Sequence, residues 1–84
     1  MIRVLYFASL REQLETGAEE LDPPPQVKDL GGLAGYLGRR GGRWSEVFDG
    51  DQTVMMALNQ EAAKGDAPVQ DGDEVAFFPP VTGG

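Results

Sequence analysis

The chain has 84 residues, of which 40% are hydrophobic, and a formal net charge of −7 at pH 7. This length fits one small domain, and the acidic charge argues against a nucleic-acid backbone as ligand, since such ligands need an excess of Lys and Arg. Because the sequence contains no cysteine and no histidine, it excludes disulfides, thiolate or imidazole metal sites, and catalysis by Cys or His within this chain.

The N-terminal segment predicts a strand followed by a short helix. MIRVLYFAS, at residues 1–9, is rich in β-branched and aromatic residues, which predicts a central strand buried on much of both faces. SLREQLE, at residues 9–15, predicts a helix in which Ser9 and Glu12 form a capping box. We expect Gly17 to end this helix.

The main helix is predicted at residues 27–40, after a short edge strand at residues 18–22 that a run of prolines terminates. Asp29 suits the first turn of this helix, and the arginines at its end suit the last turn. Its glycines lower its intrinsic stability, so the helix depends on packing. The apolar residues that share one helical face are Leu30, Leu33, Ala34 and Leu37.

The C-terminal half predicts strands joined by turns. Residues 43–52 predict a loop or a short helical turn, in which we expect Trp44 to be a packing residue. Residues 53–59 predict a strand, and residues 59–64 a turn with a short return strand. EVAFFP, at residues 74–79, predicts the last strand.

These elements predict an α+β fold, in which a mixed sheet of four or five strands has one main helix packed across it. That arrangement is the ubiquitin-like β-grasp. We expect residues 1–80 to form this domain and residues 81–84 to form a flexible C-terminal tail, because termini that are not tied down are poorly ordered.

The C-terminal residues carry the strongest functional signal. Pro79 and Pro80 favour a stiff, extended exit from the last strand, and the chain from Pro79 to Gly84 can span about 20 Å. A tip made of Gly83 and Gly84 has no Cβ atoms, so it can enter a narrow channel and present a carboxylate. Adenylation would make this carboxylate an electrophile, and a sulfur nucleophile could then displace AMP and leave a thiocarboxylate. The alternative is an inert, loose terminus.

The sequence resembles the MoaD/ThiS family of ubiquitin-like β-grasp sulfur carriers, and within it the small subunits of molybdopterin synthase. The segments that carry the resemblance are FASLRE (7–12), GGRW (41–44), ALNQE (57–61) and DGDEVAFFPPVTGG (71–84). The resemblance covers essentially the whole chain, and the last segment is its most specific part. The extended AFFPPVTGG ending is closer to these small subunits than to the carriers for thiamine or tRNA thiolation.

The resemblance implies a non-catalytic subunit that donates sulfur. A MoeB-like enzyme would adenylate Gly84 with ATP and Mg, and a sulfurtransferase or cysteine desulfurase would supply the sulfur. A MoaE-like large subunit would form a heterotetramer with this chain and would hold the catalytic side chains. The thiocarboxylate would then donate sulfur to cyclic pyranopterin monophosphate in molybdenum cofactor biosynthesis. The chain itself is expected to bind no cofactor.

The resemblance also implies the residues that contact a partner. The tail residues that would insert into the large subunit are Pro79, Pro80, Val81, Thr82 and Gly83, with Gly84 as the reactive end. The residues that match positions on the partner surface are Phe7, Arg11, Ala62 and Phe78. Ala62 stands where the family commonly has a larger apolar residue, which predicts a weaker contact there.

Alternatives stay open for these surface residues. Phe7 and Phe78 could belong to the core, but Phe77 and Phe78 are adjacent and must point to opposite faces of a strand, so one of the two lies outside the core. Arg11 could form a local ion pair with Glu12 or Glu15 instead of contacting a partner.

No metal site or membrane segment is expected. Asp71, Asp73 and Glu74 resemble a metal cluster, but DGDE is more simply a tight turn before a strand. Residues 1–10 are too short for a membrane-spanning helix and lack the pattern of a signal peptide. We therefore expect a cytoplasmic protein with neither membrane nor nucleic acid as partner.

Three other functions remain possible from the sequence. The chain could carry sulfur for thiamine or tRNA thiolation, which the identity of the sulfur acceptor would reveal. It could be a protein modifier whose Gly84 forms isopeptide bonds with lysines. It could also be a non-covalent β-grasp interaction module, whose partner binding would not change on loss of Gly83 and Gly84.

Overall fold

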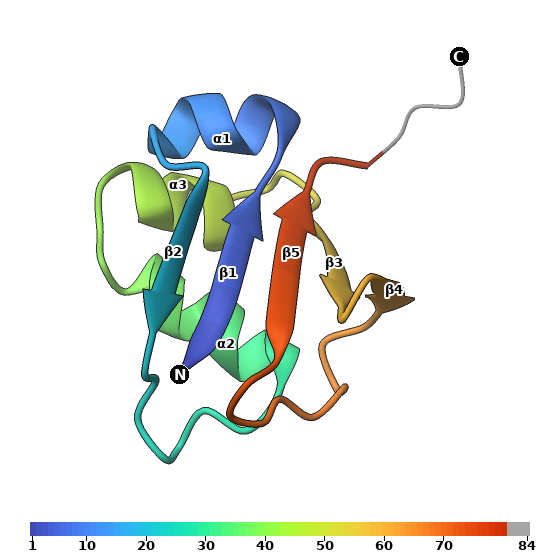
Figure 1. The fold of residues 1–84 in the computed structure, drawn as a ribbon. Coiled ribbons are helices and arrows are strands. Elements are labelled where there is room, and N and C mark those ends of the chain that lie inside the picture. The colour runs from blue at the N-terminus through green and yellow to red at the C-terminus, as the bar shows by residue number, and fades with distance from the viewer. Residues whose placement is uncertain (81–84) are drawn as a thin grey trace.

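A five-stranded mixed sheet and three helices make up residues 1–80, the part of the chain that the computed structural model describes. The strand order is β2-β1-β5-β3-β4; β1 and β5 are parallel neighbours, and the other neighbours are antiparallel (Figure 1). This is the ubiquitin-like β-grasp fold that the sequence predicts. The strands are β1 (Ile2–Tyr6), β2 (Ala18–Leu21), β3 (Met55–Leu58), β4 (Glu61–Ala63) and β5 (Glu74–Phe78).

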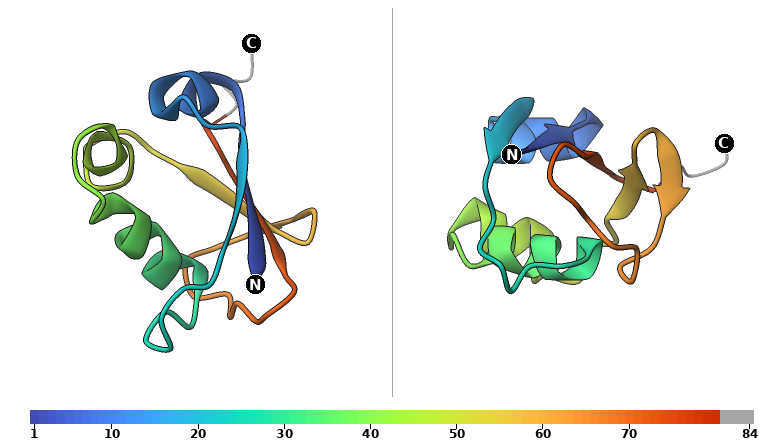
Figure 2. Two further views of the ribbon diagram at one scale, coloured as in Figure 1. Left: turned by 60° about the vertical axis from the view of Figure 1, so that its left-hand side comes forward. Right: turned by 60° about the horizontal axis from the view of Figure 1, so that its bottom comes forward.

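The helices leave one face of the sheet open. Helices α2 (Leu30–Gly38) and α3 (Arg43–Phe48) lie together on one face, while α1 (Ala8–Leu14) lies across the end of the sheet where β1 and β5 terminate (Figures 1 and 2). Within residues 1–80, no helix covers the other face (Figure 2). The chain leaves β5 at the α1 end, and the N-terminus lies at the opposite end (Figure 1).

The core lies between the sheet and the helices. Alternate residues of the two central strands point into it, as expected for strands with one covered face, and the leucines of α2 meet them from the other side. The fully buried side chains of largest volume are Tyr6, Phe77, Leu10, Leu30, Leu33, Leu37, Val4, Val47 and Val75. Trp44 packs at the margin of this core, edge-on to Tyr6 with ring centroids 5.4 Å apart, which agrees with the predicted packing role.

The prediction that β1 is buried on much of both faces is wrong. Arg3 is exposed and Leu5 is only half-buried. Both point to the face that the helices leave open. The hydrophobic run therefore reflects a partly solvated apolar face and not a strand enclosed on both sides.

The start of α1 differs from the prediction. Its N-cap residue is Phe7, and within residues 1–80 no side chain caps this end, so the capping box of Ser9 and Glu12 is wrong. The main-chain N–H of Phe7 donates to the carbonyl oxygen of Phe77 at 3.1 Å. This bond extends the β1–β5 ladder by one residue and holds Phe7 in the extended conformation.

The end of α1 also differs. The helix ends at Leu14 because Glu15 takes the left-handed conformation, with φ 54°, where Gly17 was expected to terminate it. The carbonyl oxygen of Gly17 accepts a hydrogen bond from the N–H of Tyr6 at 3.0 Å. Gly17 therefore belongs to the segment that leads into β2, and it lies beyond the end of the helix.

Helix α2 begins at Leu30, later than the predicted residue 27. Asp29 is the N-cap and not a first-turn residue, because its carboxylate accepts a hydrogen bond from the N–H of Gly32 at 2.7 Å. The carbonyl oxygen of Lys28 accepts from the N–H of Val69 at 2.9 Å. This long-range bond keeps the preceding residues out of the helix.

Candidate functional site

A continuous apolar surface crosses the uncovered face of the sheet. Leu5 pairs in register with Ala18 and Ala76, and Ala57 pairs with Ala76 and Ala62, so one row of small or aliphatic residues spans all five strands. Larger apolar side chains lie at the α1 end of this row. We call the whole surface the open face; its residues are Leu5, Phe7, Ala18, Met55, Ala57, Ala62, Ala76 and Phe78.

A groove of about 360 Å³ lies within the open face. Its apolar lining comes from β1, β3 and β5 and from the N-cap of α1, and two polar residues, Gln60 and Glu74, complete it. The apolar lining residues are Leu5, Phe7, Ala57, Ala76 and Phe78. A groove with apolar walls and a few polar groups can receive an apolar side chain from a partner and orient it through hydrogen bonds.

Phe7 is held outward by the backbone on both sides. Its N–H bonds to β5, and its carbonyl oxygen accepts from the N–H groups of Leu10 and Arg11 at 3.1 and 3.4 Å. The side chain stays 47% exposed, one of the few large hydrophobic residues on the surface of the described chain. An exposed aromatic side chain on a fixed backbone suits an anchor for a partner.

The structure separates Phe77 and Phe78 as predicted. Phe77 is fully buried in the core, whereas Phe78 is half-buried and lines the groove. Phe7 and Phe78 therefore share the open face, and the core alternative does not hold for either of them. Ala62 is exposed on β4, opposite Ala57 in register, and belongs to the same face.

Arg11 is not among the residues that line the groove. It is exposed on α1, and its side chain passes over Gly17, so closely that a Cβ atom at Gly17 would lie 3.1 Å from its Nε atom. The alternative of a local ion pair with Glu12 or Glu15 does not hold within residues 1–80, where Glu15 pairs with Arg43 instead. Arg11 therefore lies at the α1 end of the molecule, beside Gly17, and does not line the groove.

The tail begins at the same end of the sheet as Phe7. Pro79 is half-buried and Pro80 exposed, directly after β5. Val81, Thr82, Gly83 and Gly84, which were predicted as the inserting and reactive residues, lie outside the described residues.

Sequence reasoning missed several residues of the open face. Leu5, Met55, Ala57 and Ala76 were not singled out. Leu5 lies two residues before Phe7, and Ala76 two residues before Phe78, so in each pair both side chains point to the same face of the sheet. This alternation could have identified two of them. The two residues of β3 need the strand register, which pairs segments far apart in the sequence.

A polar cluster ties the β2 edge to the helices. The carboxylate of Glu19 accepts hydrogen bonds from the Tyr6 hydroxyl at 2.8 Å and from two guanidinium nitrogens of Arg40 at 2.9 and 2.8 Å. Burial alone raises the pKa of Glu19, but the hydrogen bonds from Arg40 and Tyr6 outweigh it and lower the pKa. The guanidinium of Arg40, which follows the end of α2, lies 4.4 Å from the ring centroid of Trp44.

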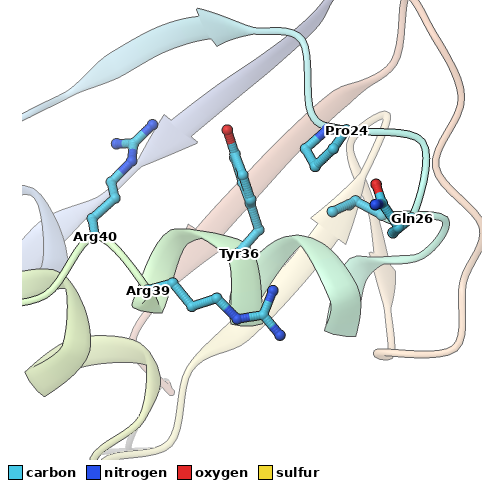
Figure 3. A pocket seen from close by; sticks show the side chains of 6 residues that line it. Pro24, Gln26, Tyr36, Arg39 and Arg40 are labelled. Carbon is cyan, nitrogen blue, oxygen red and sulfur yellow. The ribbon is translucent and has the colours of Figure 1, made fainter.

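A second hollow, of about 600 Å³, lies on the helix side between α2 and the loop that follows β2. Tyr36 stands between Arg40 on one side and Pro24 and Gln26 on the other (Figure 3). Val27 and Arg39 also line it. It lies on the opposite side of the sheet from the groove, and Arg40 is already committed to Glu19.

The predicted turn before β5 is present. Asp73 accepts hydrogen bonds from the N–H of Gln70 and the side-chain amide of Asn59, at 2.7 and 3.1 Å, and Asp71 pairs with the N-terminal ammonium group. Across residues 1–80, acidic side chains nowhere gather into a metal-binding group of three or more. Nor does any helix in that range have the length and apolar character needed to cross a membrane.

Comparison with known proteins identifies the family. The sequence profile of the ThiS family matches residues 4–84. This chain belongs to the ThiS family. This chain is 42% identical to the molybdopterin synthase sulfur carrier subunit of Escherichia coli K12, over the full length of both proteins. It is 39% identical to the subunit of the same name from Mycobacterium tuberculosis, over 99% of this chain and 96% of the relative.

Solved structures agree with this family and fold. This chain is similar to the putative molybdopterin converting factor subunit 1 of Pyrococcus furiosus, with a TM-score of 0.76 and 27% identity over 95% of this chain and 97% of the other. It is similar to SAMP1 of Haloferax volcanii, with TM-score 0.77 and 26% identity over 99% and 98%. It also shares its fold with a chain from the complex of molybdopterin-converting factor subunits 1 and 2 of Helicobacter pylori, with TM-score 0.66 and 23% identity over 99% and 97%.

Proposed function

We propose that this chain is the sulfur carrier subunit of a molybdopterin synthase. The observation that carries the proposal is the 42% identity to a relative of that name, which extends over the full length of both chains. Phe7 and Phe78, the aromatic residues of the open face, lie at the same end of the sheet as the exit of the tail. This placement would let a partner hold the open face while it receives the tail.

The chemistry belongs to the carboxylate of Gly84. An activating enzyme of the MoeB type would form an acyl-adenylate with ATP and Mg, and pyrophosphate would leave. A persulfide, supplied by a sulfurtransferase or cysteine desulfurase, would displace AMP to give an acyl disulfide, and a thiol would then cleave its S–S bond, leaving a thiocarboxylate and a new disulfide. The thiocarboxylate sulfur would then bond to cyclic pyranopterin monophosphate, and water would hydrolyse the acyl–sulfur bond, so that the sulfur stays on the pterin and Gly84 returns to a carboxylate.

The large subunit is the partner that we propose for the open face. A related chain forms a complex of subunits 1 and 2 in Helicobacter pylori. Phe7 and Phe78 would act as aromatic anchors, since buried aromatic residues dominate the binding energy of interfaces. Pro79 and Pro80 would direct the tail into the partner, with residues 1–80 as the domain and residues 81–84 as the tail.

Intact mass through one reaction cycle tests the proposal. The chain is first incubated with ATP, the activating enzyme and a sulfur source, and then with the large subunit and the pterin precursor. We expect a mass increase of one oxygen-for-sulfur exchange that reverses only when both of the last components are present. A chain that loads sulfur but never releases it to the pterin would instead serve thiamine or tRNA thiolation.

A matched variant separates carrier chemistry from folding. Deletion of Gly83 and Gly84 should abolish sulfur loading while the thermal unfolding midpoint stays unchanged, because glycine has no side chain to contribute to a core. Unchanged sulfur transfer by this variant would refute the proposal. If the variant loses no partner binding and the intact chain never loads sulfur, the chain is a non-covalent interaction module.

Similarity to SAMP1 favours a protein modifier as the second candidate, because another similar structure is that of small archaeal modifier protein 1 of Haloferax volcanii. A modifier would form isopeptide bonds between Gly84 and lysines of other proteins. Conjugates of higher mass in a cell extract, absent when Gly83 and Gly84 are deleted, would support this function over the first.

A further inference from the structure

We propose that Met55 is a site of oxidative modification, and that conversion of its thioether to the sulfoxide weakens the docking of a partner on the open face. The proposal rests on the proposed function for the identity of that partner, the large subunit. It concerns a side chain that neither the tail chemistry nor the core requires.

The methionines differ sharply in their access to solvent. The sequence has three methionines and no cysteine, so these thioethers are its only side-chain sulfur atoms. Met55 is 42% exposed on β3, whereas the neighbouring Met56 points to the other face and packs against the core. Met1 is 57% exposed, but it lies at the end of the sheet away from the tail (Figure 1).

The position of Met55 makes its polarity important. It pairs in register with Phe78, the aromatic residue that lines the groove. Strand alternation places both side chains on the open face. Met55 therefore extends the apolar surface around the groove, and its flexible, polarizable thioether suits contact with an aromatic residue or a partner.

A hydroperoxide is the class of oxidant that we propose. The sulfur lone pair attacks one peroxide oxygen, the O–O bond breaks, and an S–O bond forms. The sulfur is oxidised by two electrons. The other peroxide oxygen takes up the proton of the hydroperoxide and leaves as water or an alcohol. The product is a polar sulfoxide. A partner that covers this oxygen without donating a hydrogen bond loses affinity, because burying an unpaired polar group is unfavourable.

The test uses the intact chain with a terminal carboxylate, because a thiocarboxylate would itself react with peroxide. The chain is treated with hydrogen peroxide, and fragment masses give the degree of oxidation at each methionine. We expect Met55 to oxidise well before Met56. The oxidised chain should bind the large subunit at least about tenfold more weakly with an unchanged unfolding midpoint, and methionine sulfoxide reductase should restore the affinity.

Met55→Leu provides the matched control. Leucine keeps the apolar volume and cannot form a sulfoxide, so the peroxide-treated variant should keep its affinity although Met1 still oxidises. Full oxidation at Met55 with unchanged affinity would overturn the proposal, as would oxidation of Met56 first. The order of oxidation is measured without a partner, so it tests the site even if the untreated chain fails to bind the large subunit, a result that would count against the proposed function instead.

Discussion

Phe77 and Phe78 are adjacent in the chain, but their side chains serve opposite faces of β5. The ring of Phe77 is enclosed in the core, edge-on to Phe48 with centroids 5.0 Å apart and stacked near Tyr6 at 6.1 Å. Phe78 lines the groove of the open face. One dipeptide thus joins the stability of the fold to the surface that we propose for docking.

Alanine substitution should separate these two roles. Phe78→Ala should weaken binding of the large subunit by about tenfold or more, as expected for an aromatic anchor. Phe77→Ala should instead lower the free energy of unfolding by about 3–5 kcal/mol, because it leaves a cavity in the core. Denaturant titration and calorimetric binding measure the two effects. Normal binding by Phe78→Ala would show that the groove is not used.

Local sequence patterns account for most of the fold. The β-branched and aromatic runs at residues 1–9 and 74–79 predict β1 and β5, and the leucine spacing predicts α2. The ends of the helices are harder to predict from the sequence, since the start of α2 depends on a hydrogen bond from the N–H of Val69 to the carbonyl oxygen of Lys28. No pattern within residues 27–40 contains that contact, which joins segments distant in the sequence.

The candidate site likewise depends partly on local sequence patterns and partly on contacts between segments distant in the sequence. Phe7, Ala62 and Phe78 come from the family resemblance, and alternation along the chain explains why Phe7 shares a face with Leu5. Ala57 becomes part of the site only through its pairing with Ala76 on β5. Register between strands follows from tertiary packing, so these neighbours cannot be read from a single segment.

Two glycines of α2 should respond oppositely to alanine. Gly35 has open space around it, so Gly35→Ala should raise the free energy of unfolding by up to about 1 kcal/mol through helix propensity. At Gly31 a Cβ atom would lie 3.2 Å from the carbonyl oxygen of Gly65, and the N–H of Gly31 donates to that oxygen at 2.8 Å. Gly31→Ala should therefore destabilise the chain. Equal gains for both variants in thermal unfolding would contradict this packing.

The hydrogen bonds of Glu19 with Tyr6 and Arg40 should make the free energy of unfolding depend on pH in the acid range. Hydrogen bonds from Arg40 and Tyr6 lower the pKa of Glu19 in the folded chain despite its partial burial. A carboxyl group with a lowered folded pKa stabilises the fold above its unfolded pKa, about 4.3 for glutamate, and this contribution is lost as the pH falls through the folded value.

Glu19→Gln tests this linkage. The variant should unfold at a lower temperature than the unmodified chain at pH 7, and the difference between the two should shrink as the pH is lowered past the folded pKa of Glu19. Glu20→Gln is a suitable control, because Glu20 is the exposed neighbour on the same strand. A difference that stays constant down to acid pH would mean that the charge of Glu19 does not matter.

Ala62 offers a gain-of-binding test of the open face. It is exposed on β4, in line with Ala57, at a position where the family resemblance predicts a larger apolar residue. Ala62→Leu should therefore tighten binding of the large subunit by about tenfold, through extra apolar area buried at the interface. Its free energy of unfolding should change little, because the added side chain projects into solvent in the free chain.

Ala63→Leu is the matched control for this enlargement. Ala63 is the next residue on β4, and its side chain packs against the core on the other face of the sheet. The same increase in volume should there lower the free energy of unfolding by about 1–3 kcal/mol, since a packed interior resists overfilling, and should leave partner affinity unchanged. Tighter binding by Ala63→Leu, or weaker binding by Ala62→Leu, would place the docking surface elsewhere than on the open face.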